Sequence, residues 1–232
     1  MRDVQPSLTA HASVTVAAPE RPAVDTPAVA LVQRPASRRR LVWLFSAASF
    51  AGAALVFMVQ PMVAKMILPR LGGSPAVWNT SMVFFQALLL AGYTYAHFSY
   101  RGLGPRRQPL IHAGLLLLPL ALLPIALPAW ASPSENVELW VLALLAVTAG
   151  APYFAVTTAG PLLQRWFSTT DDPDAPDPYF LYATGNVGSM VGLLSYPALI
   201  EPFLSLAAQA RLWAGGYIVF LALVAGCAVV AV

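Results

Sequence analysis

Two polar segments interrupt an otherwise apolar chain, and they hold most of the residues that could bind a ligand. Residues 60–80 read QPMVAKMILPRLGGSPAVWNT, and residues 164–186 read QRWFSTTDDPDAPDPYFLYATGN. Charged groups that border apolar segments are costly unless they reach the surface or find a partner, and they often mark substrate pathways. We therefore look for binding chemistry first in these two segments, and we expect residues 60–80 to form a structured loop.

Lys65 and Glu201 are the two charged residues that we most expect to form an ion pair. Glu201 closes the apolar segment 179–200 on the same predicted side of the protein as Lys65. We predict an ion pair between them, and the alternative is that each side chain extends separately to the surface. Tyr153, Tyr182 and Tyr196 could then offer ring faces to a cation held near Glu201.

Six polar residues border or enter the apolar segments in these two regions, and we name them as candidate substrate-binding positions. Asn186 lies inside an apolar segment, so its amide needs a hydrogen-bond partner there, either another helix or a ligand. A structural role remains the alternative for every position. The candidates are Lys65, Arg70, Asn79, Gln86, Asn186 and Glu201.

An acidic run and two histidines are weaker candidates for metal or proton chemistry. The run lacks the glycine and the distal glutamate of a calcium-binding EF-hand loop, so we favour a solvated loop over a cation or polyamine site. We expect both histidines at the membrane interface and predict neither a metal site nor a cofactor. These residues are Asp171, Asp172, Asp174, Asp177, His97 and His112.

The chain contains no motif of a soluble enzyme. It has no GxGxxG after a strand, no GxxxxGK[ST], no HExxH and no GxSxG. Cys227 is the only cysteine, so a disulfide or zinc cluster within one chain is excluded. The net charge of +3 comes from arginines beside apolar segments, which indicates membrane topology and not nucleic-acid binding. We predict no catalytic residues and no enzymatic activity for this chain alone.

The elements that position these residues must be membrane helices. Hydrophobic residues make up 58% of the chain and charged residues only 10%, against about 45–50% and about 25% in soluble domains. We predict an all-α, polytopic bundle over residues 37–232, preceded by a disordered, proline-rich arm over residues 1–36. Six segments are near the ~20 residues that cross a bilayer. They are about 41–64, 76–98, 110–130, 138–163, 179–200 and 211–231.

Basic residues predict the orientation of this bundle. Arginines precede the first segment, lie between the second and third, and follow the fourth, whereas the other side has only Lys65, Arg70 and Arg211. The positive-inside rule then gives cytoplasmic N- and C-termini. The six tryptophans fall near predicted helix ends, where we expect them at the interface. They are Trp43, Trp78, Trp130, Trp140, Trp166 and Trp213.

Prolines and glycines predict how the helices bend and pack. Pro119, Pro124 and Pro128 should distort the third segment, because each removes a backbone donor. Gly188 and Gly192 form a GxxxG pair in the fifth segment, which favours close helix packing. This pair either packs within the bundle, the reading we favour, or makes a homo-oligomer contact.

Long strings in the chain resemble a known family. AKMILPRLGGSPAVWNTSMVFFQALLLAGYTYAH, GPLLQRWF, DPYFLYATGNVGSMVGLLSYPALIEP and QARLWAGGY look like the membrane portion of bacterial spermidine synthase-like proteins, which are fusions of a major-facilitator-type bundle and a synthase. The resemblance covers about residues 40–232. It implies a bacterial inner-membrane protein.

The resemblance also implies a role. In that family the bundle precedes a soluble, Rossmann-like domain similar to the aminopropyltransferases that make polyamines, and no position here matches that domain's site. The expectation is a module that anchors or serves such a polyamine-synthase-like partner, as a truncated fusion or a separate subunit. The alternatives are an independent small-solute half-transporter of major-facilitator type and a scaffold subunit without substrate. A polyamine carrier is disfavoured, because no carboxylate lies deep in a predicted helix.

Overall fold

The computed structural model describes residues 36–131 and 135–232, and every regular element in this part of the chain is helical. The arm predicted over residues 1–36 falls almost entirely outside the described residues. The elements in chain order are α1 (Ala36–Leu71), α2 (Pro75–Leu115), the 3-10 turn η1 (Leu118–Leu122), α3 (Val137–Leu145), the π-helical turn η2 (Ala146–Gly150), α4 (Ala151–Thr157), α5 (Ala159–Phe167), α6 (Tyr179–Ser195), the π-helical turn η3 (Tyr196–Ile200), α7 (Glu201–Phe203) and α8 (Leu206–Ala231).

Four helical stretches among the described residues are long and apolar enough to cross a membrane. They are Arg38–Leu71, Pro75–Leu122, Val137–Phe167 and Leu206–Ala231. Large apolar side chains cover the outside of the bundle, with Leu90 68%, Phe203 77% and Val229 72% exposed. Such a surface suits lipid, where apolar side chains need no cover. The predicted class, an all-α multi-pass membrane protein, is consistent with these helices.

The loop predicted over residues 60–80 is wrong, because most of that segment is helical. α1 continues through Pro61 and Pro69 to Leu71, and α2 begins at Pro75 after a turn of three residues. Ser74 caps α2 by accepting a hydrogen bond from the Val77 amide. Proline and glycine are tolerated within membrane helices, since neighbouring groups satisfy the freed backbone, so their presence did not imply a loop here.

The third predicted helix, over residues 110–130, is also wrong in its extent. α2 continues through residues 99–109 and bends at Gly104, whose φ of 74° lies in the left-handed region. The helix ends at Leu115, the 3-10 turn ends at Leu122, and residues 123–131 are not helical. The prolines predicted to bend this segment explain the early end, because each lacks the amide hydrogen that a continuing helix requires.

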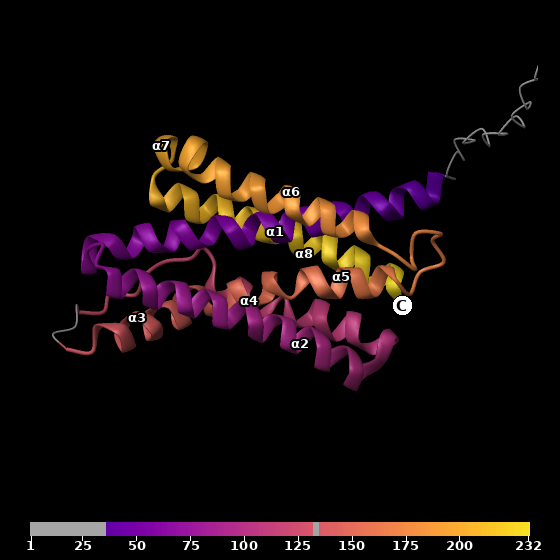
Figure 1. The fold of residues 1–232 in the computed structure, drawn as a ribbon, viewed down its shortest axis with the longest axis horizontal. Coiled ribbons are helices and arrows are strands. Elements are labelled where there is room, and N and C mark those ends of the chain that lie inside the picture. Colours follow the sequence, from indigo (N-terminus) through magenta and orange to yellow (C-terminus); the bar gives the residue numbers. More distant parts are fainter. Residues whose placement is uncertain (1–35, 132–134) are drawn as a thin grey trace, which may run out of the picture. The chain divides into compact units, whose positions relative to one another are not determined.

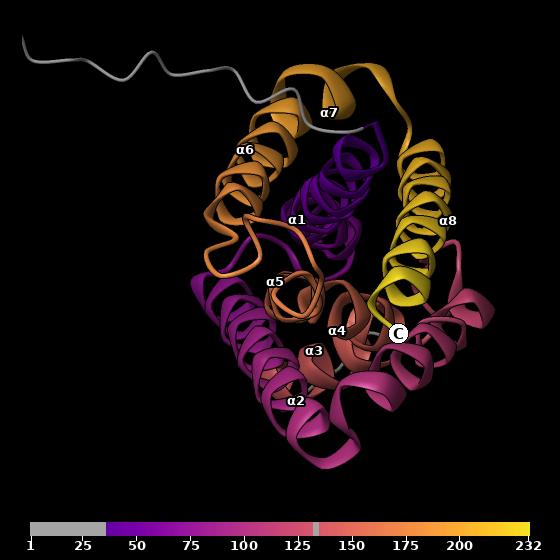
Figure 2. The ribbon, with the colours of Figure 1, turned by 90° about the vertical axis from the view of Figure 1, so that its right-hand side faces the viewer.

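α1 lies at the centre of the bundle, between α6 and α8 (Figure 2). Its closest neighbour is α6, whose Gly188 and Gly192 are buried directly against the carbonyl groups of Phe50 and Ala54 in α1. The GxxxG pair therefore packs within the bundle, as favoured above. An oligomer contact through the same face would require α6 to leave α1.

The two ends of the bundle differ in charge. The beginning of α1, the bend of α2 and the C-terminus lie at one end, and α7 lies with the beginnings of α2 and α3 at the other (Figure 1). We call these the arginine end and the Lys65 end. Exposed arginines gather at the arginine end, namely Arg38, Arg39, Arg40, Arg101, Arg106, Arg107 and Arg165.

Two of the six tryptophans are core residues and not interface anchors, which corrects the prediction for them. Trp166 and Trp213 are fully buried. The Trp166 indole donates to Gln108 Oε1 over 2.7 Å, and the Trp213 indole donates to the Leu55 carbonyl over 3.0 Å. The partner of each indole is a group that the linear sequence does not bring near, so position at a helix end could not reveal the burial.

The glycine contact between α6 and α1 gives a first prediction. Gly188→Ala should lower the free energy of unfolding by about 1–3 kcal/mol, because the added methyl group meets the Phe50 backbone. SDS titration in mixed micelles measures the change. Gly215→Ala in α8 is the matched control, since nothing lies within 4 Å of the added atom. Equal stability of the two variants would contradict the contact.

Candidate functional site

The ion pair predicted between Lys65 and Glu201 is present. Lys65 extends from α1 and donates to Glu201 Oε1 at the start of α7. The two side chains are 39% and 38% exposed, so the pair is neither sequestered in the core nor fully in solvent. The pairing leaves a locally neutral group where an isolated charge in an apolar bundle would be costly.

A π-helical turn positions Glu201. The turn η3 runs from Tyr196 to Ile200 and contains Pro197, which cannot donate to the preceding helical turn. The Tyr196 hydroxyl donates to Gln209 Oε1 of α8 over 2.9 Å, which fixes the turn against the last helix. The end of α6 is thereby held where Glu201 reaches α1.

The ion pair lines a cavity of about 470 Å³ at the Lys65 end, which we call the vestibule. Its wall contains both charged residues together with Ser74, Trp78 and Tyr196. The residues come from the end of α1, the beginning of α2 and the end of α6 with η3 and α7.

A larger cavity of about 690 Å³ adjoins the vestibule, and we call it the main cavity. The two cavities share wall residues, among them Pro61, Trp78 and Leu193. Side chains of α1, α2, α4, α5 and α6 line the main cavity, and none of these residues is charged. Its polar groups are hydroxyls, carboxamides and one indole, from Ser49, Gln60, Trp78, Ser81, Gln86, Tyr93, Tyr153, Thr157, Gln164, Tyr182, Asn186 and Ser189.

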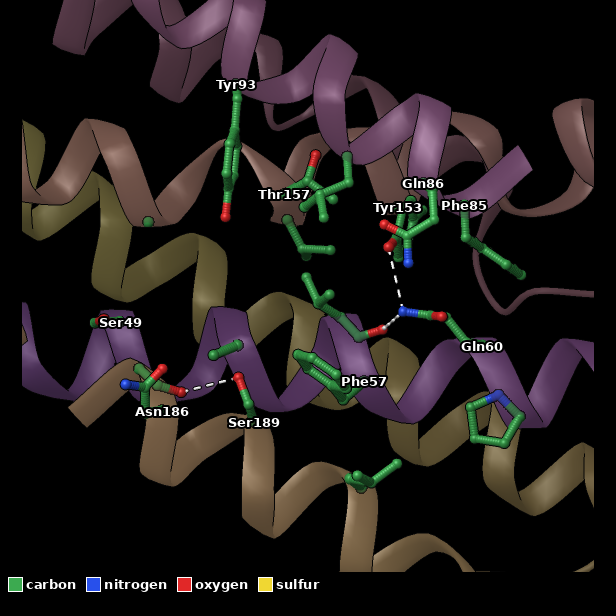
Figure 3. A pocket seen from close by; sticks show the side chains of 18 of the residues that line it. Ser49, Phe57, Gln60, Phe85, Gln86, Tyr93, Tyr153, Thr157, Asn186 and Ser189 are labelled. Carbon is green, nitrogen blue, oxygen red and sulfur yellow. Dashed lines mark hydrogen bonds between the residues drawn. The ribbon is translucent and has the colours of Figure 1, made fainter. Parts of the chain in front are cut away.

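One hydrogen bond crosses the main cavity between α1 and α4. Gln60 Nε2 donates to the Tyr153 hydroxyl over 3.2 Å and to the Val56 carbonyl over 3.2 Å (Figure 3). The Tyr153 ring is buried, with the Phe85 ring edge-on at a centroid distance of 4.9 Å. Packing therefore fixes the ring and leaves the hydroxyl at the cavity wall.

Two carboxamides face this cavity from opposite helices. Gln86 comes from α2 and Asn186 from α6 (Figure 3). Neither side chain hydrogen-bonds another residue in the described part of the chain, so both remain available to a ligand. α2 and α6 make almost no direct contact, and Tyr93 and Tyr182 on these helices are half-exposed. The main cavity therefore opens sideways between α2 and α6.

The structure separates the six candidate positions into three groups. Lys65 and Glu201 line the vestibule, and Gln86 and Asn186 line the main cavity. Arg70 donates to the Pro128 carbonyl over 2.6 Å and thus ties the end of α1 to the segment after η1. Asn79 is exposed and lines neither cavity.

The three tyrosines proposed to stand near Glu201 divide between the two cavities. Tyr196 shares the vestibule with Glu201. Tyr153 and Tyr182 line the main cavity and not the vestibule.

The prediction that His112 lies at the membrane interface is wrong. His112 is buried between the two parts of α2 and α5, with Nδ1 3.3 Å from the Tyr95 hydroxyl and Nε2 3.2 Å from Thr158 Oγ1. The bend at Gly104 turns its segment back against the bundle, which position in the sequence did not reveal. His97 is exposed, and its position at the interface stays a prediction.

The acidic run is more ordered than a solvated loop. Asp172 is buried, and its Oδ1 accepts a hydrogen bond from the Asp174 amide over 3.0 Å. The Ala175 amide donates to the Asp172 carbonyl over 2.9 Å. No group of histidine, cysteine and carboxylate side chains in the described residues could hold a metal ion.

Sequence reasoning missed Gln60, Thr157 and Gln164 as cavity residues. Gln60 is the one of the three that the sequence could have indicated, because it is a carboxamide inside an apolar segment and such residues face the bundle interior. The other two residues join the site only because α4 and α5 pack beside α1.

Comparison with protein-family models, curated proteins and solved structures finds no match to this chain. Its function is therefore inferred from its own residues and from the resemblance described above.

The ion pair gives a second prediction. Lys65→Glu and Glu201→Lys should each lower the amount of folded protein in the membrane several-fold, because each leaves two like charges side by side. The double variant should restore it. Detergent extraction followed by size-exclusion chromatography measures the amount. Arg211→Glu, which changes an exposed arginine of α8, is the control and should have little effect. Absence of any rescue by the double variant would contradict a stabilising pair.

The polar wall of the main cavity gives a third prediction. Cys227 is the only cysteine in the sequence, so one substitution gives a cysteine-free background. In a Cys227→Ala background, Ser189→Cys should react with a charged methanethiosulfonate reagent, because Ser189 lines the polar cavity. Met190→Cys on the same helix should not react, because Met190 lies on the apolar outer surface, where lipid would keep a charged reagent away. Mass spectrometry measures the labelled fraction. Equal labelling of the two positions would contradict a water-accessible cavity.

Proposed function

We propose that this chain is a membrane module with six crossings that binds a small amphipathic organic molecule in the main cavity. The observation that carries this proposal is an uncharged cavity of about 690 Å³ inside an apolar bundle. Ligand sites are concave, largely apolar spaces of about 300–1,000 Å³ with a few polar groups that orient the ligand. Gln86 and Asn186 supply such groups on opposite walls.

Six crossings are supported by the paths of two segments. The chain reverses at Gly104, and the carbonyl of Pro128 meets Arg70 at the far end of α1, so residues 105–128 run back along the bundle. α6 with η3 and α7 lies beside α1 for most of its length and ends at Lys65. Each segment therefore accompanies a helix of membrane length, and we propose that each crosses with it.

The proposed orientation places the arginine end in the cytoplasm. The exposed arginines of this end precede α1, border the bend of α2 and follow α5. An excess of arginine and lysine in short connections is typical of the cytoplasmic side. The termini of the bundle are then cytoplasmic in a bacterial inner membrane, the compartment that the family resemblance implies.

The absence of charged residues from the wall of the main cavity indicates the class of molecule that it binds. A polycation such as spermidine would need carboxylates in a low-dielectric space, and the residues lining this cavity include none. Carboxamides, hydroxyls and aromatic rings instead suit a molecule with an uncharged body and hydrogen-bonding groups. The opening between α2 and α6 gives such a molecule a route from the bilayer.

The family resemblance adds a partner to this proposal. A soluble, polyamine-synthase-like domain or subunit would lie against the arginine end, and the bundle would anchor it and serve it. The alternative is that this chain transports the same molecule independently, as a half-transporter. The main cavity, open between α2 and α6, favours this alternative because it gives a solute a route into the bundle.

Photolabelling tests the binding proposal. The probe is a diazirine derivative of octanol, an uncharged amphiphile, irradiated with the protein in lipid nanodiscs. Peptide mass spectrometry should locate adducts on the main-cavity faces of α1, α2 and α6 in excess over the lipid-facing surface. Ser189→Trp should remove most of this labelling, because Ser189 lines the main cavity and the larger indole would occupy part of its volume.

Met190→Trp is the matched control for this experiment. It adds the same side chain at the next position on α6, where the residue is exposed on the apolar surface, and it should leave the cavity adducts in place. Labelling spread evenly over the lipid-facing helices, or unchanged by Ser189→Trp, would contradict a binding site in the main cavity.

A further inference from the structure

The vestibule differs from the main cavity in holding two opposite charges that a ligand could reach. Lys65 and Glu201 both line it, and each side chain is about two-fifths exposed. The charges satisfy one another in the described structure. A ligand that binds them must therefore offer each charge a replacement, since a charge left alone in an apolar bundle is strongly unfavourable.

This requirement selects the charge type of the ligand. An anion alone would bind Lys65 and leave Glu201 without its partner, and a cation alone would do the reverse. A zwitterion satisfies both, because its anionic group replaces Glu201 on Lys65 while its ammonium group replaces Lys65 on Glu201. The exchange converts one ion pair into two and leaves the site neutral.

The surrounding wall is suited to the same arrangement. Ser74 caps α2 and lines the vestibule, so the positive end of a long helix borders the vestibule and favours an anionic group there. Trp78 lines the vestibule as well, and its exposed indole offers a ring face to an ammonium group.

The connection to the main cavity defines the rest of the ligand. Trp78 and Leu193 belong to both walls, so a molecule with its charged group in the vestibule can extend an apolar part into the uncharged space. We infer that the vestibule binds the charged group of a zwitterionic amphiphile, with its anionic group on Lys65 and its ammonium group on Glu201. This inference rests on the proposed function and specifies the substrate class.

Two sources could supply this chemistry, and the experiment separates them. Native mass spectrometry in detergent measures the affinity of the purified protein for dihexanoyl phosphatidylethanolamine, a lipid, and for phenylalanine, a free solute. Dihexanoyl phosphatidylglycerol and phenethylamine are the singly charged controls for each. At least one zwitterion should bind about tenfold tighter than its control, a difference of about 1.4 kcal/mol. Preference for the lipid assigns a bilayer source, and preference for phenylalanine assigns a solute.

A double variant tests the two charges directly. Lys65→Gln with Glu201→Gln removes both charges, so neither is left unpaired, and it should abolish the preference for the zwitterion. Arg211→Gln is the control, since it removes an exposed charge of α8 that lines neither cavity, and it should retain the preference. Equal affinity of the wild type for zwitterions and singly charged controls, or an unchanged preference in the double variant, would overturn the inference. Photolabelling of the main cavity by diazirine-octanol would still stand in either case, so the two proposals fail separately.

Discussion

The close contact of α6 with α1 determines where the cavities and their charges lie. In lipid there is no hydrophobic force that drives helices together, so association depends on van der Waals packing and on hydrogen bonds. Gly188 and Gly192 have no Cβ and allow the α6 backbone to lie on the carbonyl groups of α1. This contact holds Asn186 at the edge of the main cavity and directs the end of α6 towards Lys65. Larger residues at the two glycines would move both cavity walls.

Irregular helical turns then refine the positions of single side chains. The π-helical turn η2 precedes the cavity residue Tyr153, and η3 precedes Glu201. Pro152 and Pro197 lie within or beside these turns and lack the amide hydrogen of a regular helix. π-helical turns are frequently found at functional sites, because the extra residue changes the direction of the side chains that follow. Both turns here lie next to residues that line a cavity.

The distribution of polar groups divides the bundle into regions of different character. The Lys65 end has a paired charge and the vestibule, and the middle has uncharged hydrogen-bonding groups. Towards the arginine end, Gln108 and His112 are buried, and they hydrogen-bond Trp166 of α5 and Thr158, the residue before α5. These bonds hold the reversed part of α2 against the bundle, which a lipid environment favours because unsatisfied polar groups are costly there.

The sequence by itself predicted the class of the protein, an all-α membrane bundle, and the ion pair of Lys65 with Glu201. Composition and segment length predicted membrane helices, because the energy of burying apolar or charged groups in lipid depends mainly on residue type. The same reasoning led to the pair of Lys65 and Glu201, since two opposite charges on the same predicted side gain by meeting. Arg70 and Asn79 were chosen because they are polar and border the apolar segments, yet they line neither cavity, since polarity alone does not determine which way a side chain faces.

Only the tertiary structure decided which polar residues share a cavity. Gln60 and Tyr153 meet across 93 positions of sequence, and Trp166 and Trp213 are buried because helices distant in the chain cover them. The sequence also misplaced helix ends, since the proline-containing end of α1 was predicted as a loop and stays helical, whereas the segment after η1 was predicted as helix and is not helical. The physical reason is that packing partners compensate a missing backbone hydrogen bond, and those partners are known only once the helices are assembled.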